Sequence, residues 1–163
     1  MPGASPYYIE SGDFYMDKID KIIINMLQEN ARATISEMSS KVSLSMPAIS
    51  ERVKKLEASG IIEKYTAIIN PKKVNKGLSA MVFVSLSDAE REKDFSEFVK
   101  NEGAITECHF ITGPFQYCMK VFTESPAALQ ELTWRIREMG ATKTDVMLLL
   151  SSVVERPSIQ LTE

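Results

Sequence analysis

Polar and basic side chains recur at helical spacing between residues 45 and 58. Hydroxyl and ammonium groups can hydrogen-bond to phosphates or base edges, and a carboxylate can accept a hydrogen bond from a cytosine amine. The candidate groups for such contacts are Ser45, Pro47, Ser50, Glu51, Arg52, Lys54 and Lys55. Arg52 lies beside the apolar stripe of the same segment, so a neighbouring acid is an alternative partner for it.

The elements that would hold these groups are two short helices joined by a turn. Thr34 and Glu37 form a capping box that starts the first helix, and Ser45 is a suitable N-cap for the second. Pro47 suits a first helical turn, and Gly60 suits the position just after a helix. The pattern is typical of a helix-turn-helix, although an ordinary helical hairpin with solvated lysines would share it.

A further helix precedes this pair and a β-rich segment follows it. Apolar residues recur at helical spacing from Ile19 to Leu27, with Asp17 or Asp20 as the cap or first-turn anion. Residues 61–71 are rich in β-branched and aromatic side chains and end at Asn70-Pro71, which predicts a short β-hairpin. Together these elements predict a winged helix-turn-helix.

The second half of the chain predicts a ferredoxin-like βαββαβ domain, so the fold class is α+β with an antiparallel sheet. The expected strands span residues 79–86, 105–112, 115–123 and 142–155, and the expected helices span 90–102 and 126–139. The last strand is apolar at nearly every position, and both of its faces should therefore be buried. Because both helices would cover one face of the sheet, we expect the other face to mediate sheet-to-sheet dimerisation.

Charge is distributed unevenly along the chain, whose net charge is −3. Residues 16–77 contain eleven Lys or Arg and seven acids, and residues 78–163 contain eight and thirteen. A basic first half and an acidic second half suit a DNA-binding unit joined to a self-associating one. The excess in the first half is modest, so useful DNA affinity should require a dimer or a larger assembly.

Other classes of protein find little support in the sequence. No apolar run approaches a membrane span, the N-terminus does not resemble a signal peptide, and the two cysteines lack metal-ligand spacing, so we expect a cytoplasmic protein without a membrane partner, a metal or a cofactor. His109, the only histidine, follows Cys108 in a predicted strand, where adjacent side chains point to opposite faces. A Cys–His dyad is not expected, and the predicted protein is not an enzyme.

Several segments in order resemble the Lrp/AsnC family, also called feast/famine regulators, over residues 16 to about 155. The resemblance is carried by Asp17–Asp20, Ser50–Glu57, Gly60–Ile62, Tyr65–Ala67, Asn70-Pro71, Glu107–His109, Thr112-Gly113, Gln116-Tyr117 and Thr142–Thr144. It implies a DNA-binding transcriptional regulator that forms homodimers through its C-terminal sheets. It also implies assembly into a tetramer or octamer.

The same resemblance implies a small-molecule effector, usually an amino acid, bound between dimers. The implied effector-binding residues are Gly113, Pro114, Phe115, Gln116, Tyr117, Thr142 and Thr144. Gln116 stands where the family usually has Asp, and a neutral amide cannot balance an amino group. Either the effector differs or binds more weakly, or Gln116 serves only the structure of the hairpin.

The expected domain organisation follows from these assignments. Residues 1–15 are a flexible extension or a non-native remnant, 16–71 the winged helix-turn-helix, 72–78 a linker, 79–156 the dimerisation and effector-binding domain, and 157–163 a C-terminal tail. The leading interpretation is a multimeric regulator that responds to an effector. The alternatives are an architectural protein of the same fold that wraps DNA without an effector, and a small enzyme or free ligand-binding module.

Overall fold

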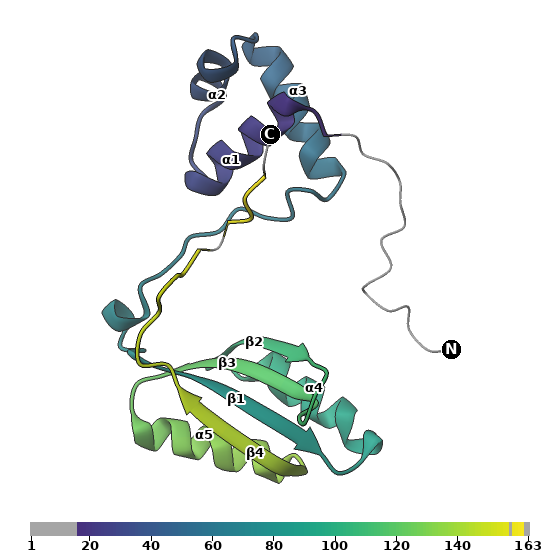
Figure 1. Cartoon of the computed structure of the whole chain (residues 1–163), viewed down its shortest axis with the longest axis vertical. Helices are drawn as coiled ribbons and strands as arrows, with labels where there is room; N and C mark the ends of the chain where they lie inside the picture. The colour runs from purple at the N-terminus through teal and green to yellow at the C-terminus, as the bar shows by residue number, and fades with distance from the viewer. Residues whose placement is uncertain (1–15, 157, 162–163) are drawn as a thin grey trace. The chain divides into compact units, whose positions relative to one another are not determined.

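Three helices form the first part of the computed structural model, which describes residues 16–156 and 158–161 (Figure 1). The helices are α1 (Lys18–Glu29), α2 (Ile35–Val42) and α3 (Met46–Ala58). Each buries an apolar stripe in a shared core, whose buried members are Ile23, Ile24, Met38, Ile49 and Leu56. The three-helix unit therefore has the core that the apolar periodicities predicted.

Side chains cap the starts of all three helices. Asp17 and Asp20 form a capping box at α1, and Thr34 and Glu37 form the predicted one at α2. At α3 the Ser45 hydroxyl accepts the N–H of Ala48 at 3.4 Å, as expected for the predicted N-cap. These contacts satisfy backbone donors that a helix leaves unpaired at its N-terminus.

The segment after α3 does not form the predicted hairpin. Gly60 ends the helix with a φ of +75°, a conformation that favours glycine. Residues 63–70 have neither helix nor strand geometry, so the predicted β-hairpin is wrong. A 3₁₀ helix, η1 (Pro71–Val74), follows, with the Asn70 side chain accepting the N–H of Lys72.

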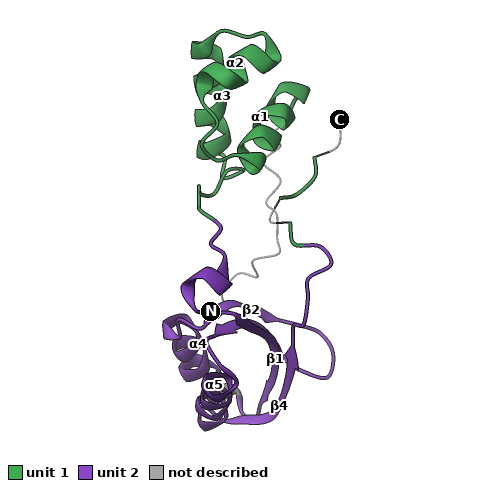
Figure 2. Cartoon of the chain, turned by 90° about the vertical axis from the view of Figure 1, so that its left-hand side faces the viewer, with its two compact units in different colours: residues 1–67, 155–163 green, residues 68–154 purple. Residues whose placement is uncertain are grey.

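A four-stranded antiparallel sheet with two α-helices follows, as predicted. The strands are β1 (Leu78–Leu86), β2 (Ile105–Phe110), β3 (Tyr117–Thr123) and β4 (Ala141–Leu148), and the helices are α4 (Glu92–Asn101), α5 (Pro126–Glu138) and a short 3₁₀ helix, η2 (Ala89–Arg91). Their order along the chain confirms the βαββαβ arrangement, and the strand order in the sheet is β2-β3-β1-β4. Both α-helices lie on one face of the sheet (Figure 2).

The core of this part lies between the sheet and the two helices. Alternate residues of β1 face it, and β3, α4 and α5 complete it. Its buried members are Ala80, Val82, Val84, Leu86, Phe95, Met119, Val121, Leu129, Leu132 and Ile136. The face of the sheet away from the helices carries the other set of alternating residues.

Strand β4 is shorter than predicted. It was expected to reach residue 155 because the sequence stays apolar, but it ends at Leu148. β4 lies at the edge of the sheet and pairs only with β1, where Leu148 lies opposite Ala80, close to the start of β1. One further bond, from the N–H of Leu149 to the carbonyl of Ser79, is the last along this edge. The strand thus ends where its neighbour begins.

The chain divides into two compact units, and the first is discontinuous in sequence. Residues 1–67 and 155–163 form unit 1, and residues 68–154 form unit 2. The described residues of the predicted C-terminal tail therefore belong with the three helices. None of the helices in the described part of the chain combines the length and apolar character needed to span a membrane.

Candidate nucleic-acid interface and effector site

Helix α3 is held by a turn at its start and by buried side chains along one face. Ser43 adopts the left-handed conformation, with φ of +56°, and reverses the chain between α2 and α3. Ile49 and Leu56 of α3 are fully buried. The opposite face of α3 is consequently turned outward.

Most of the predicted DNA-contacting side chains lie on this outward face. Ser45, Pro47, Glu51, Lys54 and Lys55 are exposed, whereas Ser50 and Arg52 are half-buried. The structure thus groups the candidates on one helix, and their individual contacts with DNA stay predictions.

Met46, which sequence reasoning missed, is also exposed on α3, at 53%. The prediction considered polar and charged side chains, but apolar side chains can contact the methyl group of thymine. Its position in the first turn of the helix, directly after Ser45, was the available signal.

Arg52 is engaged within the three-helix unit. Its Nη1 donates to Asp17 Oδ2 at 2.8 Å and to Asp20 Oδ1 at 2.7 Å. These bonds, the one to Asp20 first, raise the pKa of Arg52 above its ordinary value. A guanidinium held by two carboxylates is poorly placed to bind a phosphate. We therefore assign Arg52 to positioning α3 against α1. Pairing with a neighbouring acid was the alternative to DNA contact that the sequence left open for this residue.

The two capping boxes make the stability of this unit sensitive to acid. The pKa of Asp17 lies below 3.8, mainly because its carboxylate accepts the backbone N–H of Asp20. Desolvation acts in the opposite direction, and Arg52 lowers the pKa further. The backbone N–H of Thr34 similarly lowers the pKa of Glu37 below 4.5. A carboxylate whose pKa is lower in the folded state stabilises the fold above its unfolded pKa and loses that effect as the pH falls through its folded pKa.

We therefore expect the melting temperature of the three-helix unit to fall as the pH drops below 4.5 and then below 3.8. Circular dichroism melts across this range would show it. A double variant, Asp17→Asn with Glu37→Gln, should be less stable at neutral pH, and its melting temperature should depend less steeply on pH. Glu63→Gln, which changes an exposed residue, is the control and should behave as wild type. An equally steep dependence in the double variant would contradict the assignment.

Tyr65 fixes part of the segment after α3. Its hydroxyl donates to Glu57 Oε1 at 2.9 Å. Burial first, and then Glu57, raise the pKa of Tyr65 to about 12, so the phenol stays protonated and can donate. The segment that replaces the predicted hairpin is thereby tied to helix α3.

The predicted effector residues meet at one end of the sheet, where β1 ends and β3 and β4 begin. Gln116 Oε1 accepts the N–H of Leu86 at 2.7 Å, and the N–H of Gln116 donates to the carbonyl of Val84 at 3.0 Å. The Gln116 carbonyl also accepts the N–H of Ile111 at 2.8 Å. Gln116 therefore joins the end of β1 to the loop that precedes β3, which favours the structural interpretation of this residue.

One group of these residues lies on the open face of the sheet. The Phe115 ring packs against Phe83 at a centroid distance of 5.6 Å, and Lys143 Nζ lies 4.4 Å from the Phe115 ring centre. Nearby, the Thr142 hydroxyl donates to the carbonyl of Ser85 at 3.1 Å. An aromatic ring beside an ammonium group can contact an apolar or anionic ligand.

A second group lies on the face that packs against the helices. Tyr117 and Thr144 both lie opposite the buried Val84, and the Tyr117 ring is 4.9 Å from that of Phe95. Thr144 Oγ1 is buried and makes no hydrogen bond within the described structure. The predicted effector residues are thus close along the sheet but divided between its two faces, and they do not surround one cavity within a single chain.

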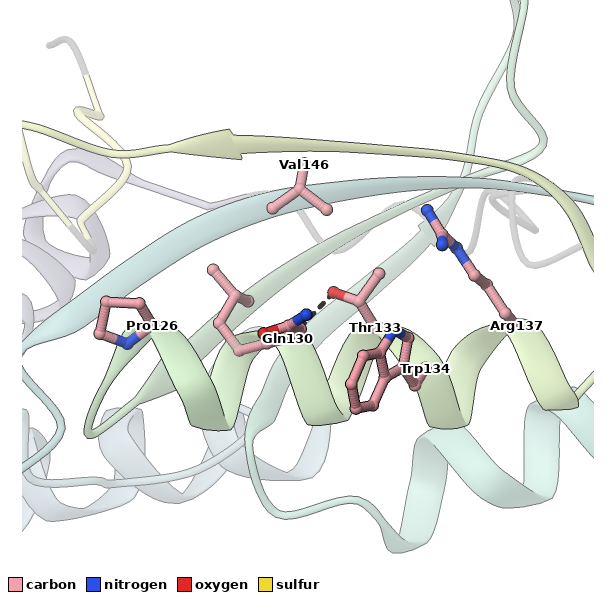
Figure 3. A pocket seen from close by; sticks show the side chains of 7 residues that line it. Pro126, Gln130, Thr133, Trp134, Arg137 and Val146 are labelled. Atoms are coloured by element: carbon pink, nitrogen blue, oxygen red, sulfur yellow. Dashed lines mark hydrogen bonds between the residues drawn. The ribbon is translucent and has the colours of Figure 1, made fainter.

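An open groove lies elsewhere in the described part of the chain, between α5 and β4 (Figure 3). It has a volume of about 320 Å³ and is lined by Pro126, Leu129, Gln130, Thr133, Trp134, Arg137 and Val146. Trp134 is 56% exposed, so it is a surface residue and not part of the core. None of the predicted effector residues lines this open groove.

Cys108 and His109 point to opposite faces of the sheet, as expected. Cys108 lies opposite the buried Met119, and His109 lies opposite Cys118 and 3.4 Å from Glu107. Burial raises the pKa of Cys108, which disfavours the reactive thiolate. Within residues 16–156 and 158–161, no group of three or more His, Cys, Asp or Glu side chains could hold a metal ion.

Two protein families account for most of the sequence. Residues 16–63 match a family described as winged helix-turn-helix DNA-binding, and residues 79–159 match the Lrp/AsnC ligand binding domain. The chain is 31% identical over 137 residues to the HTH-type transcriptional regulator LrpA of Mycobacterium tuberculosis, covering 84% of this chain and 91% of that one. It is 32% identical over 139 residues to the leucine-responsive regulatory protein of Escherichia coli, and the match covers 82% of this chain and 85% of that protein.

Solved structures agree with these matches. A transcriptional regulator of Neisseria meningitidis, determined in complex with L-Met, superposes with a TM-score of 0.84 at 29% identity and covers 88% of this chain and 95% of that chain. The likeness extends over both units.

Proposed function

The chain belongs to the Lrp/AsnC family of DNA-binding transcriptional regulators, and we propose that it binds DNA as a homo-oligomer whose binding an amino acid or a related small molecule modulates. The observation that carries the DNA-binding part is the outward face of α3, where Lys54 and Lys55 are exposed on a helix anchored by Ile49 and Leu56. Residues 16–71 would serve DNA binding, and residues 79–156 would serve dimerisation and effector binding.

The sheet face away from α4 and α5 supports the homodimer. Met81 and Phe83 alternate with buried residues of β1 and so project from this face. Met147 of β4 lies opposite Met81 and is 52% exposed. Apolar side chains exposed together on a sheet mark an interface. We propose that the sheets of two copies pack face to face here, and that dimers assemble further into a tetramer or octamer.

The proposed role of Lys54 gives a measurable expectation. Lys54→Ala should weaken DNA binding several-fold and reduce the salt dependence, the slope of log K against log [salt], by about one, because one phosphate contact is lost. Fluorescence anisotropy across a salt series measures both. Lys100→Ala, which changes an exposed lysine of α4, serves as the matched control. An unchanged slope would remove Lys54 from the interface.

The effector proposal rests on the match of residues 79–159 to the Lrp/AsnC ligand binding domain. The Phe115 ring beside Lys143 on the open face of the sheet supports it, because this pair can contact a ligand. The N. meningitidis regulator was solved with L-Met, which makes amino acids the first class to test.

Gln116→Asp should bind at least one amino acid about tenfold more tightly than wild type, because a carboxylate at this position can balance an ammonium group. Calorimetry with both proteins across the standard amino acids provides the measurement. Gln130→Asp, on the exposed face of α5, is the control. Absence of heat with every amino acid in both proteins would refute the amino-acid proposal.

That outcome would favour the second candidate function, an architectural DNA-wrapping protein without an effector. The observation in its favour is that the Gln116 amide oxygen already bonds to the backbone of β1. In either case we propose a cytoplasmic regulator without catalytic activity.

The proposal as a whole is tested by binding to a labelled fragment of the protein's own upstream DNA. We expect tight binding, a steep dependence on salt, and more than one dimer on each fragment. Failure to bind this fragment more tightly than random DNA, with amino acids present or absent, would contradict regulation of this site. Failure to bind random DNA even at low salt would overturn DNA binding through α3.

A further inference from the structure

The end of the chain returns to helix α1. Gln28 Nε2 donates to the carbonyl of Ile159 at 2.9 Å, and the N–H of Ile159 donates to Gln28 Oε1 at 2.7 Å. One side-chain amide thus bonds both backbone groups of a single residue that lies 131 positions away. A neighbouring strand makes this pair of bonds in an antiparallel sheet, and here the glutamine takes the place of that strand.

Two further contacts extend this docking beyond Ile159. Asn25 Nδ2 lies 3.4 Å from the carbonyl of Leu161, one helical turn from Gln28 along α1. The Leu161 side chain is half-buried and packs against the core of the three helices. The tail therefore contributes both backbone hydrogen bonds and an apolar side chain.

The docking depends on backbone position more than on the identity of residue 159. The Ile159 side chain is 75% exposed, so its apolar character is not used in the contact. Gln28, in contrast, is half-buried and uses both polar atoms of its amide. A glutamine with both atoms engaged by a backbone is a built contact for an extended peptide.

We infer that residues Gln28 and Asn25 of α1, with the adjoining apolar core, form a docking site for an extended peptide, and that residues 158–161 of the same chain occupy it. The DNA-binding unit would then have three helices and a fourth, C-terminal component. The matched DNA-binding family covers residues 16–63 and does not include this component.

The position of the site connects it to the recognition helix. Helix α1 begins at the capping box whose carboxylates hold Arg52 of α3. Loosening the C-terminal half of α1 should therefore reduce the population of the three-helix arrangement that presents α3. The effect on DNA affinity rests on the proposed function, whereas the effect on α1 does not.

The first test removes residues 158–163 from the full-length protein and measures hydrogen exchange by mass spectrometry. We expect amides of α1, residues 18–29, to exchange at least tenfold faster, and the unit's melting temperature to fall by about 5–10 °C. Emission of Trp134, the only tryptophan, reports unit 2 and should not change. Unchanged protection of α1 would overturn the inference.

The second test uses single substitutions that leave the chain length unchanged. Gln28→Ala should reproduce the faster exchange of α1, and Gln160→Ala, an exposed glutamine in the tail, should not. Equal effects of the two substitutions would overturn the assignment of Gln28. DNA affinity should fall in Gln28→Ala and stay unchanged in Gln160→Ala. Faster exchange without loss of affinity would overturn only the link to DNA binding.

The third test identifies the occupant. A synthetic peptide of residues 155–163, added at millimolar concentration to the shortened protein, should restore the protection of α1, and failure to do so would overturn the docking site. The protection of α1 should also be the same at low and at high protein concentration, because a segment of the same chain stays bound on dilution. Protection that is lost on dilution would overturn the assignment to the same chain.

Discussion

Arg52→Ala should lower the melting temperature of the DNA-binding unit by about 10 °C and weaken DNA binding at least tenfold while leaving the salt slope unchanged. The substitution leaves Asp20, which is 6% exposed, without its cationic partner. Breaking a fully buried ion pair costs about 3–5 kcal/mol, and an exposed one contributes about 0–1 kcal/mol. The side chains of Arg52 and Asp20 are 29% and 9% exposed, so we expect a cost of about 2 kcal/mol, which corresponds to about 10 °C in a unit of this size.

The unchanged salt slope separates positioning from phosphate contact. A residue that binds a phosphate releases a counterion, so its removal reduces the slope by about one. Arg52→Ala and Lys54→Ala are therefore matched variants from the same helix with opposite expectations. Asp20→Asn should weaken DNA binding in the same way as Arg52→Ala, although it removes a negative charge. A reduced slope in Arg52→Ala, or stronger DNA binding in Asp20→Asn, would place Arg52 on the DNA.

Met147→Glu should convert the dimer into a monomer and weaken DNA binding by about a hundredfold or more. Met147 projects from the open face of the sheet beside Met81, so the new carboxylate would be buried without a partner in the proposed interface. Because the side chain is 52% exposed within one chain, the fold of the monomer should tolerate the change. DNA affinity falls because two α3 helices no longer bind as one connected unit.

Light scattering coupled to gel filtration measures the mass, and anisotropy measures the affinity. Gln130→Glu introduces the same charge on an exposed position of α5 and should leave both unchanged. A Met147→Glu protein that remains dimeric and retains its affinity would exclude the open sheet face as the dimer interface.

Local sequence signals predicted the helices and their caps well. A helix cap involves residues within one turn of each other, so both partners stand close together in the sequence. Examples are Thr34 with Glu37 at α2, and Ser45 before Pro47 at α3. The apolar, β-branched run of residues 79–86 likewise predicted strand β1. These features depend on neighbours a few positions away.

The errors arose where the missing information was a distant partner. Ile68 and Ile69 have the β-branched side chains of a strand, but they are 72% and 60% exposed in a segment that no strand pairs with in the described structure. Strand propensity reflects packing against neighbours, so composition alone predicted a hairpin that does not form. Similarly, β4 ends because β1 begins at Leu78, a limit that the apolar sequence after Leu148 does not reveal.

The candidate site shows the same division. The outward face of α3 could be predicted from helical periodicity, whereas the engagement of Arg52 depends on carboxylates more than thirty positions earlier. No local signal distinguishes Gln28 from the other polar residues of α1, because its partner Ile159 lies 131 positions away. Periodicity predicts which side of a helix is polar and does not identify what that side binds.

The docking of the C-terminal segment also has a consequence for the order of events during synthesis. A chain leaves the ribosome from its N-terminus, and its N-terminal parts generally fold first. Helices α1, α2 and α3 emerge early, but Ile159 and Leu161 cannot reach α1 until residues 78–148, which contain the sheet, have been translated. A nascent or prematurely terminated chain would contain the recognition helix without its last supporting segment. Full DNA-binding competence would thus be acquired only by chains that also contain the complete sheet domain.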